Sequence, residues 1–369
     1  MKNTDEFYMQ KAISLALKGT GTTHPNPIVG CIIVKNNKII GEGYHKRYGD
    51  LHAERNALKN CIENPENAEM YVTLEPCCHY GKTPPCTEAI IENKISKVII
   101  GSVDSNPLVS NKGIEKLKAN NINVKTGVLE AECLKINEVF FHYIKNKTPF
   151  ISMKYAMSLD GKIATSSGES KWITGEDARL NVQNLRNKYT GIMVGIGTVL
   201  TDNPSLDCRI PNGNNPIRII CDSKLSIPLN SKIVCSSKEI PTIIAYNKIF
   251  KNKEKLDKLN KFNIETISIS SNENKTNINL YELFKILGNR GIDSILVEGG
   301  GRIHASLLEN NLINKVYSFI APKLIGGKDA LTPIEGAGIL NLSSAPILSS
   351  VNFEKLGDSF LISGIIKNN

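Results

Sequence analysis

The sequence lacks any apolar run long enough to span a membrane, although the chain is 369 residues long. The first twenty residues carry acidic residues early and repeat apolar residues at helical spacing. This pattern favours a first amphipathic helix over residues 5–19 rather than a signal peptide. We therefore expect no membrane partner. Internal repeats are absent too, and the one stretch expected to be loose is the polar loop 270–278.

Cysteine occurs nine times, an odd number, and most of these residues lie inside apolar runs. A secreted scaffold held by disulfides would be expected to show an even number of cysteines. Free thiols in a reducing compartment explain the pattern better, so we expect a cytoplasmic protein.

Acidic residues are fewer than basic ones, and the formal net charge is +9. A basic excess suits either nucleic acid or phosphorylated small ligands. Much of it falls in the stretch 248–261, which is typical of the solvated face of one helix. The charge alone therefore selects no partner, and the sequence leaves open whether the chain forms a homo-oligomer.

Apolar content of 41% and charged content of 22% are ordinary for a globular protein, and the length suffices for two cores. The polar segment 145–149 marks a boundary between domains 1–146 and 147–369. In the first domain strands alternate with helices, and Asn36 and Asn37 predict a hairpin turn. The alternation predicts three α/β/α layers around a mostly parallel sheet. Beyond the hairpin, the expected strands are 69–74, 97–101 and 122–126, and the expected helices are 52–62, 84–93, 112–120 and 130–144.

The second domain restarts the same alternation at residue 150. The segment 197–209, dense in Asn, Asp and Pro, is expected to be a loop. The expected helices are 175–187, the lysine-rich 248–261, 280–289 and 302–310, and the expected strands are 150–157, 190–195, 216–221, 241–246, 264–269, 293–298, 314–320, 347–354 and 359–366.

The strongest chemical signal runs from His52 to Cys86. His52 and Glu54 open a helical run, and Cys77 and Cys86 follow in a loop punctuated by glycine and proline. One imidazole and two thiolates suit Zn²⁺, and three protein ligands leave a fourth tetrahedral position for water. Glu54 is near enough to carry protons without binding the metal. This arrangement predicts a zinc-dependent deaminase.

Two other interpretations of these cysteines stay open. A structural zinc site would close with a fourth ligand, for which Cys78 or His79 stands nearby. A disulfide between Cys77 and Cys86 is the second alternative. Neither explains a glutamate two residues after the histidine. The eight residues between the two cysteines also exceed the usual Pro-Cys-x-x-Cys spacing.

Softer signals in the second domain point to a nucleotide. A strand that runs into Glu298-Gly-Gly-Gly and then a helix can cradle a pyrophosphate or simply make a tight turn. Trp172 lies in a polar loop, where it can stack on a planar ring or fill the core. Asp160 precedes a glycine and suits a turn, whereas Asp202 suits either capping or ligand contact.

Taken in order, the motifs resemble one family along nearly the whole chain. They are HPNPIVG at 24–30, HAE at 52–54, EPCCHYGKTPPC at 75–86, MKYAMSLDGKIAT at 153–165, GESKWIT at 168–174, GTVLTDNPSLDCR at 197–209, VEGGGRIHASLL at 297–308 and APKLIGG at 321–327. The series resembles the bifunctional deaminase–reductases of riboflavin biosynthesis, in which the zinc motif has this longer loop. The resemblance implies an α/β protein with an N-terminal cytidine-deaminase-like α/β/α domain and a C-terminal dihydrofolate-reductase-like α/β domain. Cys78 departs from the serine expected at its position.

In the first domain the resemblance assigns zinc binding to His52, Cys77 and Cys86 and proton transfer to Glu54. An ammonium at position 82 suits the ribose phosphate of the substrate. The substrate contacts that the resemblance implies are Asn26, Lys82 and Thr83.

In the second domain the resemblance implies sites for NADPH and for the substrate. Lys154 and Asp202 are the candidates for polar groups beside the reacting carbon. The choice of NADPH over NADH comes from the family, because no residue marks a site for the 2′-phosphate. Positions that match the NADPH site are Ala156, Trp172, Thr198, Asp202, Ser223, Gly300, Gly301, Arg302, Ile303, His304, Ala305 and Ser306. Positions that match the substrate site are Ser170, Arg186, Leu206, Arg209 and Glu298, and the two arginines suit a phosphate.

The expected function is hydrolytic deamination of 2,5-diamino-6-(ribosylamino)pyrimidin-4-one 5′-phosphate, followed by NADPH-dependent reduction of its ribosyl group to ribityl. The expected partner is thus a small phosphorylated pyrimidine and not nucleic acid. A nucleic-acid-editing deaminase shares the zinc motif, but it needs no EGGG turn and would show a basic strip studded with aromatic residues near the zinc. A non-catalytic sensor of zinc and nucleotide would have no use for Glu54.

Overall fold

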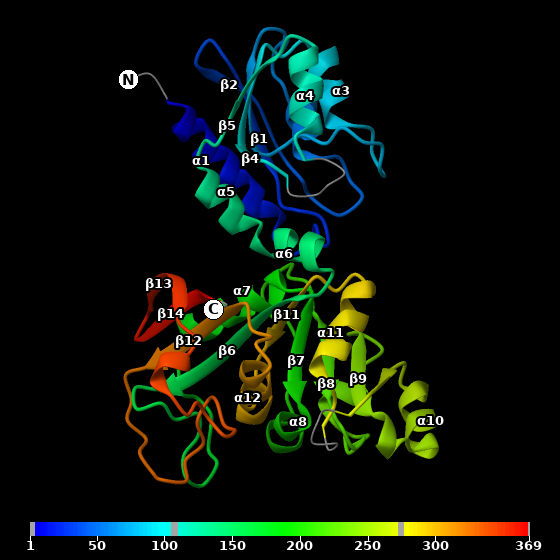
Figure 1. The fold of residues 1–369 in the computed structure, drawn as a ribbon, viewed down its shortest axis with the longest axis vertical. Helices are drawn as coiled ribbons and strands as arrows, with labels where there is room; N and C mark the ends of the chain where they lie inside the picture. The colour runs from blue at the N-terminus through cyan, green and yellow to red at the C-terminus, as the bar shows by residue number, and fades with distance from the viewer. Residues whose placement is uncertain (1–3, 105–109, 272–276, 368–369) are drawn as a thin grey trace. The chain divides into compact units, whose positions relative to one another are not determined.

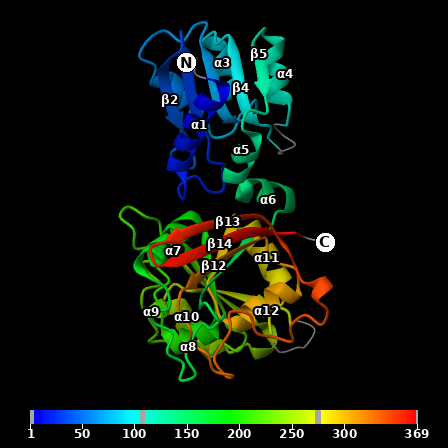
Figure 2. The same cartoon turned by 90° about the vertical axis from the view of Figure 1, so that its left-hand side faces the viewer.

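The structure, a computed structural model, describes residues 4–104, 110–271 and 277–367 (Figure 1; Figure 2). The chain divides into two compact units, Met1–Lys147 and Thr148–Asn369. None of the helices in the described ranges is long and apolar enough to cross a membrane. The loop 270–278, expected to be loose, lies largely outside the described residues.

The first unit is one sheet covered by helices on both faces (Figure 1). Its strands are β1 (Gly30–Lys35), β2 (Lys38–Tyr44), β3 (Glu69–Leu74), β4 (Lys97–Ser102) and β5 (Asn123–Thr126). Its helices are α1 (Asp5–Ala16), the 3-10 turn η1 (Leu17–Gly19), α2 (Ala53–Lys59), α3 (Cys86–Glu92), α4 (Lys112–Ala119), α5 (Glu130–Ile136) and α6 (Glu138–Asn146). The expected α/β/α layers are confirmed.

Alternation along the strands builds the two cores of this unit. Ile32 and Ile99 face α1 and α5, whereas Ile33 and Ile100 face α2, α3 and α4. Successive strand residues point to opposite faces, so a strand buried on both faces needs apolar residues at nearly every position. The apolar runs of β1 and β4 meet this requirement.

The sheet is mixed, in the order β2-β1-β3-β4-β5. Asn36 and Asn37 join β1 and β2 with φ angles of 50° and 61°, and a two-residue turn of this kind joins only antiparallel strands. The predicted hairpin is confirmed. Strand β1 also pairs antiparallel with β3, so the expected parallel arrangement holds only for β3, β4 and β5.

The helix expected over 130–144 is divided at Asn137 into α5 and α6. The buried Asn137 side chain accepts a hydrogen bond from Ile28 N at 2.9 Å and donates one to Ile28 O at 3.0 Å. These two bonds attach the segment to the loop before β1. A tertiary contact therefore ends the first helix, and the sequence pattern gave no sign of it.

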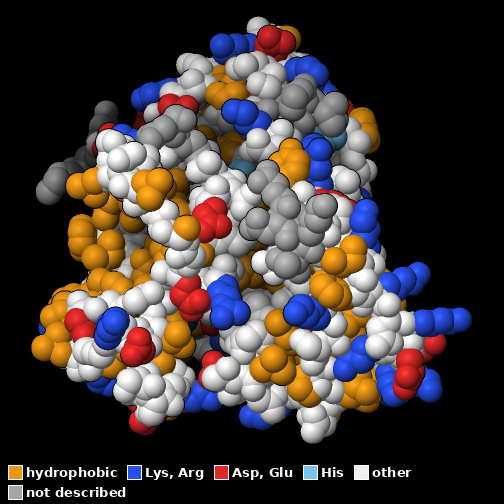
Figure 3. Space-filling model, turned by 60° about the horizontal axis from the view of Figure 1, so that its bottom comes forward, with side chains coloured by type: hydrophobic (Ala, Val, Ile, Leu, Met, Phe, Trp, Pro, Cys, Tyr) orange, Lys and Arg blue, Asp and Glu red, His pale blue; other side chains and the backbone are white. Residues whose placement is uncertain are grey.

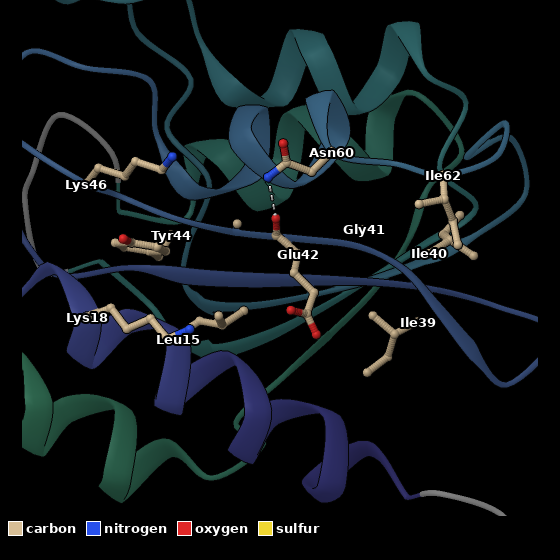
Figure 4. Close-up of a pocket in the computed structure, with 11 residues that line it drawn as sticks. Leu15, Lys18, Ile39, Ile40, Gly41, Glu42, Tyr44, Lys46, Asn60 and Ile62 are labelled. Atoms are coloured by element: carbon tan, nitrogen blue, oxygen red, sulfur yellow. Dashed lines mark hydrogen bonds between the residues drawn. The ribbon is translucent and has the colours of Figure 1, made fainter.

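Strand β2 lies at the edge of this sheet, and residues in or after α2 cap its outward carbonyl groups. Asn60 Nδ2 donates to Glu42 O at 2.9 Å (Figure 4), and Ile62 N donates to Ile40 O at 2.8 Å. Asn56 Nδ2 donates to Tyr44 O at 2.9 Å. Paired carbonyls at an edge discourage the addition of a further strand.

The second unit is built on a nine-stranded sheet, in the order β10-β9-β8-β7-β11-β6-β12-β14-β13. Its strands are β6 (Phe150–Ser158), β7 (Gly191–Gly195), β8 (Ile217–Cys221), β9 (Thr242–Asn247), β10 (Glu265–Ile269), β11 (Ser294–Val297), β12 (Lys315–Ala321), β13 (Leu348–Leu356) and β14 (Ser359–Ile366). Its helices are α7 (Glu176–Lys188), α8 (Ile196–Asp202), α9 (Lys232–Cys235), α10 (Lys253–Lys261), α11 (Leu280–Asn289) and α12 (Gly301–Glu309), with the 3-10 turns η2 (Lys248–Phe250) and η3 (Leu342–Ser344).

The strands from β10 to β12 in this order are parallel, and β14 and β13 close the sheet in antiparallel pairing. Helices α11 and α12 pack on one face, and α8, α9 and α10 pack on the other. Carboxyl ends of parallel strands meet at one edge, where α/β proteins bind ligands. The loops after β6, β7, β8 and β11 therefore emerge at the same edge.

Two helices of this unit were not expected. Residues 197–209 were expected to be a loop, but their first part forms α8, which follows Gly195 and ends before Asn203-Pro204. With only seven residues and two glycines nearby, α8 shows too little periodicity for recognition. The four-residue α9 was missed for the same reason. In the lysine-rich α10 only Leu259 is buried, as the expectation of a solvated helix face requires.

Several apolar side chains of the second unit reach the surface. The face drawn in Figure 3 mixes apolar side chains with charged ones of both signs. The large exposed apolar residues between positions 324 and 360 include Leu324, Leu340, Leu342, Ile347 and Phe353.

Candidate active sites

The metal cluster predicted from the sequence forms in the first unit. Cys77 follows the end of β3, Cys86 begins α3, and His52 is the residue directly before α2. His52 Nδ1 lies 3.5 Å from Cys77 Sγ and 3.4 Å from Cys86 Sγ. The three ligand atoms lie within 4.8 Å of one another, and this donor set suits a tetrahedral Zn²⁺.

The arrangement favours thiolate at Cys77. A hydrogen bond with Cys86 lowers the pKa of Cys77 well below its usual range, against the opposing effect of burial, and His52 lowers it further. The backbone N–H of Cys86 also donates to Cys77 Sγ at 3.3 Å. Thiolate is the form that binds metal.

The two alternatives for the cysteines are not supported by this geometry. Cys77 and Cys86 are free thiols and not a disulfide. In the described part of the chain, neither Cys78 nor His79 joins the metal cluster, so the three ligands leave one tetrahedral position open.

Glu54 lies in the first turn of α2 and is only 3% exposed. Burial raises its pKa to about 7, and the nearby Cys77 contributes in the same direction. Its carboxyl group lines the same cavity as His52 and Cys77. A carboxyl group beside the metal position and protected from water is suited to proton transfer.

The cavity at the metal cluster has a volume of about 290 Å³. It contains all three substrate contacts implied for this domain, Asn26, Lys82 and Thr83. Lys82 Nζ lies 3.9 Å from the centre of the Tyr48 ring, so its charge is held at the cavity wall.

His45 is a lining residue that the sequence analysis missed. It is buried and lies between Leu51 and Asn26: its Nδ1 is 3.2 Å from Leu51 O, and its Nε2 is 3.3 Å from Asn26 Nδ2. Its ring also meets the His52 ring edge-on at 5.2 Å. The available signal was a histidine directly after strand β2, where a strand end opens into a loop.

A larger cavity, of about 540 Å³, lies beside the edge strand β2 (Figure 4). Leu15, Ile39 and Ile62 form its apolar part, and Lys18 and Lys46 lie at its polar end. None of the metal-binding residues lines it. Gly41, Glu42 and Gly43 of β2 line it, so it lies against the capped edge of that strand.

In the second unit, Glu298 meets two of the predicted cations. Arg186 of α7 donates from Nε and Nη2 to the Glu298 carboxylate at 2.7 and 2.9 Å, and Lys154 Nζ of β6 lies 3.7 Å from it. Burial would raise the pKa of Glu298, but Arg186 and Lys154 overcome that effect and lower it to about 2. Arg186 also donates from Nη1 to Asp207 O at 2.8 Å, which fixes the loop after α8.

The glycine turn after β11 meets α8. Gly299 has a φ angle of 137°, which strongly favours glycine, and its carbonyl accepts a hydrogen bond from Gly195 N at 3.1 Å. A Cβ at Gly300 would lie 3.5 Å from Thr198 Oγ1. Two segments expected to line NADPH are thereby brought together.

Within the segment Gly300 to Ser306 the side chains have different roles. Ile303 and Ala305 are buried. His304 is also buried, and its Nδ1 lies 2.8 Å from Pro333 O, so its ring holds a neighbouring loop. Arg302 is exposed and lies 3.6 Å from Glu335, and Ser306 is half-buried. The backbone amides at the very start of α12 are thus available to a ligand, whereas those of Ile303 and His304 donate to Gly300 O at 3.1 and 3.2 Å.

The remaining predicted residues lie on loops of the second unit, on β6 or at the end of α8. Trp172 is 61% exposed, so the alternative that it fills the core is wrong. Leu206 is buried, whereas Arg209 is largely exposed and lies 3.7 Å from Asp207.

Within the described ranges no hydrogen bond or ion pair joins Asp202 to Lys154. Ala156 is on β6, Ser170 is half-buried in the loop before α7, and Ser223 O accepts a hydrogen bond from Asn247 N.

Comparison with known proteins extends over both units. The family model for the cytidine and deoxycytidylate deaminase zinc-binding region matches residues 2–102, and the model for the RibD C-terminal domain matches residues 149–362. The riboflavin biosynthesis protein RibD of Actinobacillus pleuropneumoniae is 47% identical over 98% of this chain and 96% of that protein. RibD of Escherichia coli K12 is 38% identical over 93% of this chain and 94% of that protein.

Two solved structures are similar to this chain over nearly its whole length. A diaminohydroxyphosphoribosylaminopyrimidine deaminase/5-amino-6-(5-phosphoribosylamino)uracil reductase from Thermotoga maritima has a TM-score of 0.86 and 37% identity, covering 98% of this chain and 99% of that one. RibD of Acinetobacter baumannii has a TM-score of 0.87 and 33% identity, covering 99% of both chains. The chain belongs to the RibD family of riboflavin biosynthesis, whose members combine a zinc-dependent deaminase domain with an NADPH-dependent reductase domain.

Proposed function

We propose that this chain deaminates 2,5-diamino-6-(ribosylamino)pyrimidin-4-one 5′-phosphate and then reduces the ribosyl group of the product with NADPH. The observation that carries the proposal is the cluster of His52, Cys77 and Cys86, which shares a cavity with the buried Glu54 and with Lys82. The nine free cysteines support a reducing, cytoplasmic location.

In the deaminase site His52, Cys77 and Cys86 hold the zinc ion, which when bound supplies a Lewis acid that activates water. Glu54 takes a proton from that water and delivers it to the departing amino group, which leaves as ammonia. Its buried position keeps competing bulk water away from this transfer. Water and the diaminopyrimidine thus give the pyrimidinedione and ammonia.

Lys82 and Asn26 orient the substrate in this cavity. Lys82 presents a point charge to the ribose 5′-phosphate, and its contact with the Tyr48 ring limits the motion of its long side chain. Asn26 offers an amide to the polar edge of the ring or sugar, and Thr83 offers a hydroxyl.

In the reductase site NADPH supplies the hydride, and the chain supplies orientation and charge. The backbone amides at the start of α12, around Gly300 and Gly301, bind the pyrophosphate, with Thr198 alongside. Trp172 lies against the nicotinamide or its ribose. Asp202 at the end of α8 and Ser223 in the loop after β8 line the cofactor.

Lys154 is the polar group that we place beside the reacting carbon, because Glu298 holds its ammonium in place. C1′ of the ribosyl group accepts hydride as its bond to the ring oxygen breaks, that oxygen takes a proton and becomes a hydroxyl, and NADPH is oxidised to NADP⁺. Arg186 is already paired on two sides, so the more exposed Arg209 is the better candidate for the phosphate.

Two point variants test whether the chain carries two separable reactions. Glu54→Gln is expected to lose deamination yet to reduce the deaminated compound with NADPH at the wild-type rate. Asp202→Ala is expected to deaminate normally while reduction falls. The measurement is NADPH consumption and ammonia release on each compound separately. Loss of both activities in either variant would contradict independent sites.

The reductase is also expected to discriminate against the undeaminated compound. An amino donor would stand where the site expects a carbonyl acceptor, and a mismatch of this kind is worth a few kcal/mol, about a hundredfold in rate. Equal NADPH consumption by Glu54→Gln on both compounds would contradict the proposed order.

A further inference from the structure

Two loops of the second unit run side by side. One follows β6 and covers residues 159–174, and the other follows β12 and covers residues 322–331 (green and orange in Figure 1). Strands β6 and β12 are parallel neighbours, so their carboxyl ends emerge together. Leu159 N donates to Lys323 O at 2.8 Å, and Ile163 N donates to Leu331 O at 2.9 Å. The two loops therefore form one layer.

The Asp160 carboxylate links the two loops of this layer. It accepts hydrogen bonds from Ser158 Oγ at 2.6 Å, Ile325 N at 3.1 Å and Gly326 N at 2.6 Å. The bond from Ser158 and those from the two backbone amides lower the pKa of Asp160 to about 2. The side chain is therefore charged at physiological pH, and one acid fixes the tip of the opposite loop.

The other end of the layer holds Trp172. Lys323 Nζ donates to Trp172 O at 3.0 Å, and the Arg179 guanidinium lies 4.9 Å from the centre of the indole. The indole is 61% exposed, so core packing does not hold it. Its position depends instead on Arg179 and on Lys323, which belongs to the loop that Asp160 fixes.

We propose that Asp160 is a positioning residue of the reductase site, which holds Trp172 in place through residues 323–326 of the second loop. This proposal concerns the reductase site of the proposed function. Only its expected kinetic effect rests on the proposed NADPH-dependent reduction. Asp160 does not touch Trp172 directly. Its hydrogen bonds hold the second loop in one conformation, and Lys323 of that loop bonds to the Trp172 backbone. The indole is therefore held in a fixed position beside the cofactor.

The chain offers a direct measurement, because Trp172 is its only tryptophan. Asp160→Asn keeps the size of the side chain but puts an N–H₂ donor where a carboxylate oxygen accepts a backbone N–H. At least one bond to the second loop is thus lost. We expect the tryptophan anisotropy to show faster and wider local motion, and acrylamide quenching to rise about twofold, as expected for a group freed from a hydrogen-bonded loop.

The kinetic result expected for Asp160→Asn is selective. The KM for NADPH should rise about three- to tenfold while kcat changes less. In the variant, NADPH binding must order the mobile Trp172 side chain, and the free energy of that ordering weakens binding. Deaminase activity in the same chain should be unchanged, which controls for enzyme concentration. Far-UV circular dichroism and the thermal midpoint show whether the second unit is folded.

Matched variants distinguish the path from Asp160 through Lys323 to Trp172 from a general effect of losing charge in these loops. Asp329→Asn removes the same charge from the second loop of the layer, and Asp329 has no hydrogen bond or ion pair within the described ranges. It should leave both the anisotropy and the KM for NADPH unchanged. Lys323→Met should reproduce the effect of Asp160→Asn. The double variant should be no worse than the more severe single variant, because both act on one path.

The outcomes distinguish this inference from the proposed function. Unchanged tryptophan anisotropy in Asp160→Asn would overturn the inference, whatever the kinetics. Additive effects of Asp160→Asn and Lys323→Met would overturn the path through Lys323. Energy transfer from Trp172 to bound NADPH in the wild-type protein tests the cofactor site itself, and its absence would overturn the proposed place of NADPH without bearing on the link from Asp160 to Trp172.

Discussion

Arg186 and Glu298 form a two-point ion pair, with Nε 2.7 Å from Oε1 and Nη2 2.9 Å from Oε2. Their side chains are only 12% and 8% exposed. Lys154 adds a second cation to the same carboxylate. Asp207 Oδ1 lies 3.9 Å from Arg186 Nη1, so two cations and two carboxylates alternate in this group and hold one another in place.

Replacing Glu298 by Gln leaves both cations buried without a carboxylate between them. Removal of one partner from a buried ion pair typically costs about 3–5 kcal/mol, and we expect the free energy of unfolding of the second unit to fall by that order. Guanidinium denaturation measures the change. Glu354→Gln on the exposed face of β13 is the control, and it should change stability by less than about 0.5 kcal/mol. Equal effects of the two variants would contradict the structural importance of the pair.

The same carboxylate predicts a dependence of stability on pH. The pKa of Glu298 is about 2 in the folded chain, against about 4.3 for an unperturbed glutamate. A depressed folded pKa gives stability that is complete above the unfolded value and is lost as pH falls toward the folded value. The unfolding free energy of wild type should therefore decline from about pH 4.5 to about pH 2 more steeply than that of Glu298→Gln. Parallel pH profiles would show that Glu298 is not the group responsible.

Glu54→Gln should retain zinc while it loses deamination. The amide removes the proton carrier but no metal ligand, and general acid–base groups commonly contribute about two to four orders of magnitude. Ammonia release and elemental analysis are measured on the same preparation. A loss of activity below about tenfold would exclude the proton-transfer role, and a loss of zinc would make Glu54 part of the metal site.

Cys78→Ser should leave zinc content and deaminase rate nearly unchanged. In the described structure Cys78 stands outside the metal cluster, and the fourth position must stay open for water. Cys77→Ser, one residue away, is the matched contrast and should lose most of its zinc. If Cys78→Ser also loses its metal, the closed structural site with four protein ligands becomes the better description.

Asn26 and His45 should act as a coupled pair. The Leu51 carbonyl can only accept a hydrogen bond, so His45 Nδ1 carries the proton; burial lowers the pKa of His45 and keeps the ring neutral. His45 Nε2 then accepts from Asn26 Nδ2 and leaves Asn26 Oδ1 free to turn toward a ligand.

A double-mutant cycle of Asn26→Ala and His45→Ala measures this coupling in the deaminase kcat/KM. Residues in contact commonly show interaction energies of about 0.5–3 kcal/mol, and the second substitution should cost little once the first is present. Zinc content is the control for each variant. Fully additive losses would mean that His45 does not act through Asn26.

Much of the fold was predictable because its signals are local. The turn at Asn36 and Asn37 needs only residues that tolerate positive φ, and β1 and β4 show their burial as unbroken apolar runs. Helices α5 and α6 were not separable in this way. Their break depends on Asn137, which binds the backbone of a residue 109 positions away.

The sequence by itself determined the chemistry of the first site, because His52, Glu54, Cys77 and Cys86 are chemically specialised and stand at a spacing that few other functions require. Only the tertiary structure decided which charges neutralise one another and which residues support the site. Arg186 and Glu298 are 112 positions apart, and Asp160 and Gly326 are 166 positions apart. A periodic pattern reports on neighbours along one helix or strand, whereas pairings of this kind form when parallel strands bring their carboxyl ends, and the loops that follow them, to the same edge of the sheet.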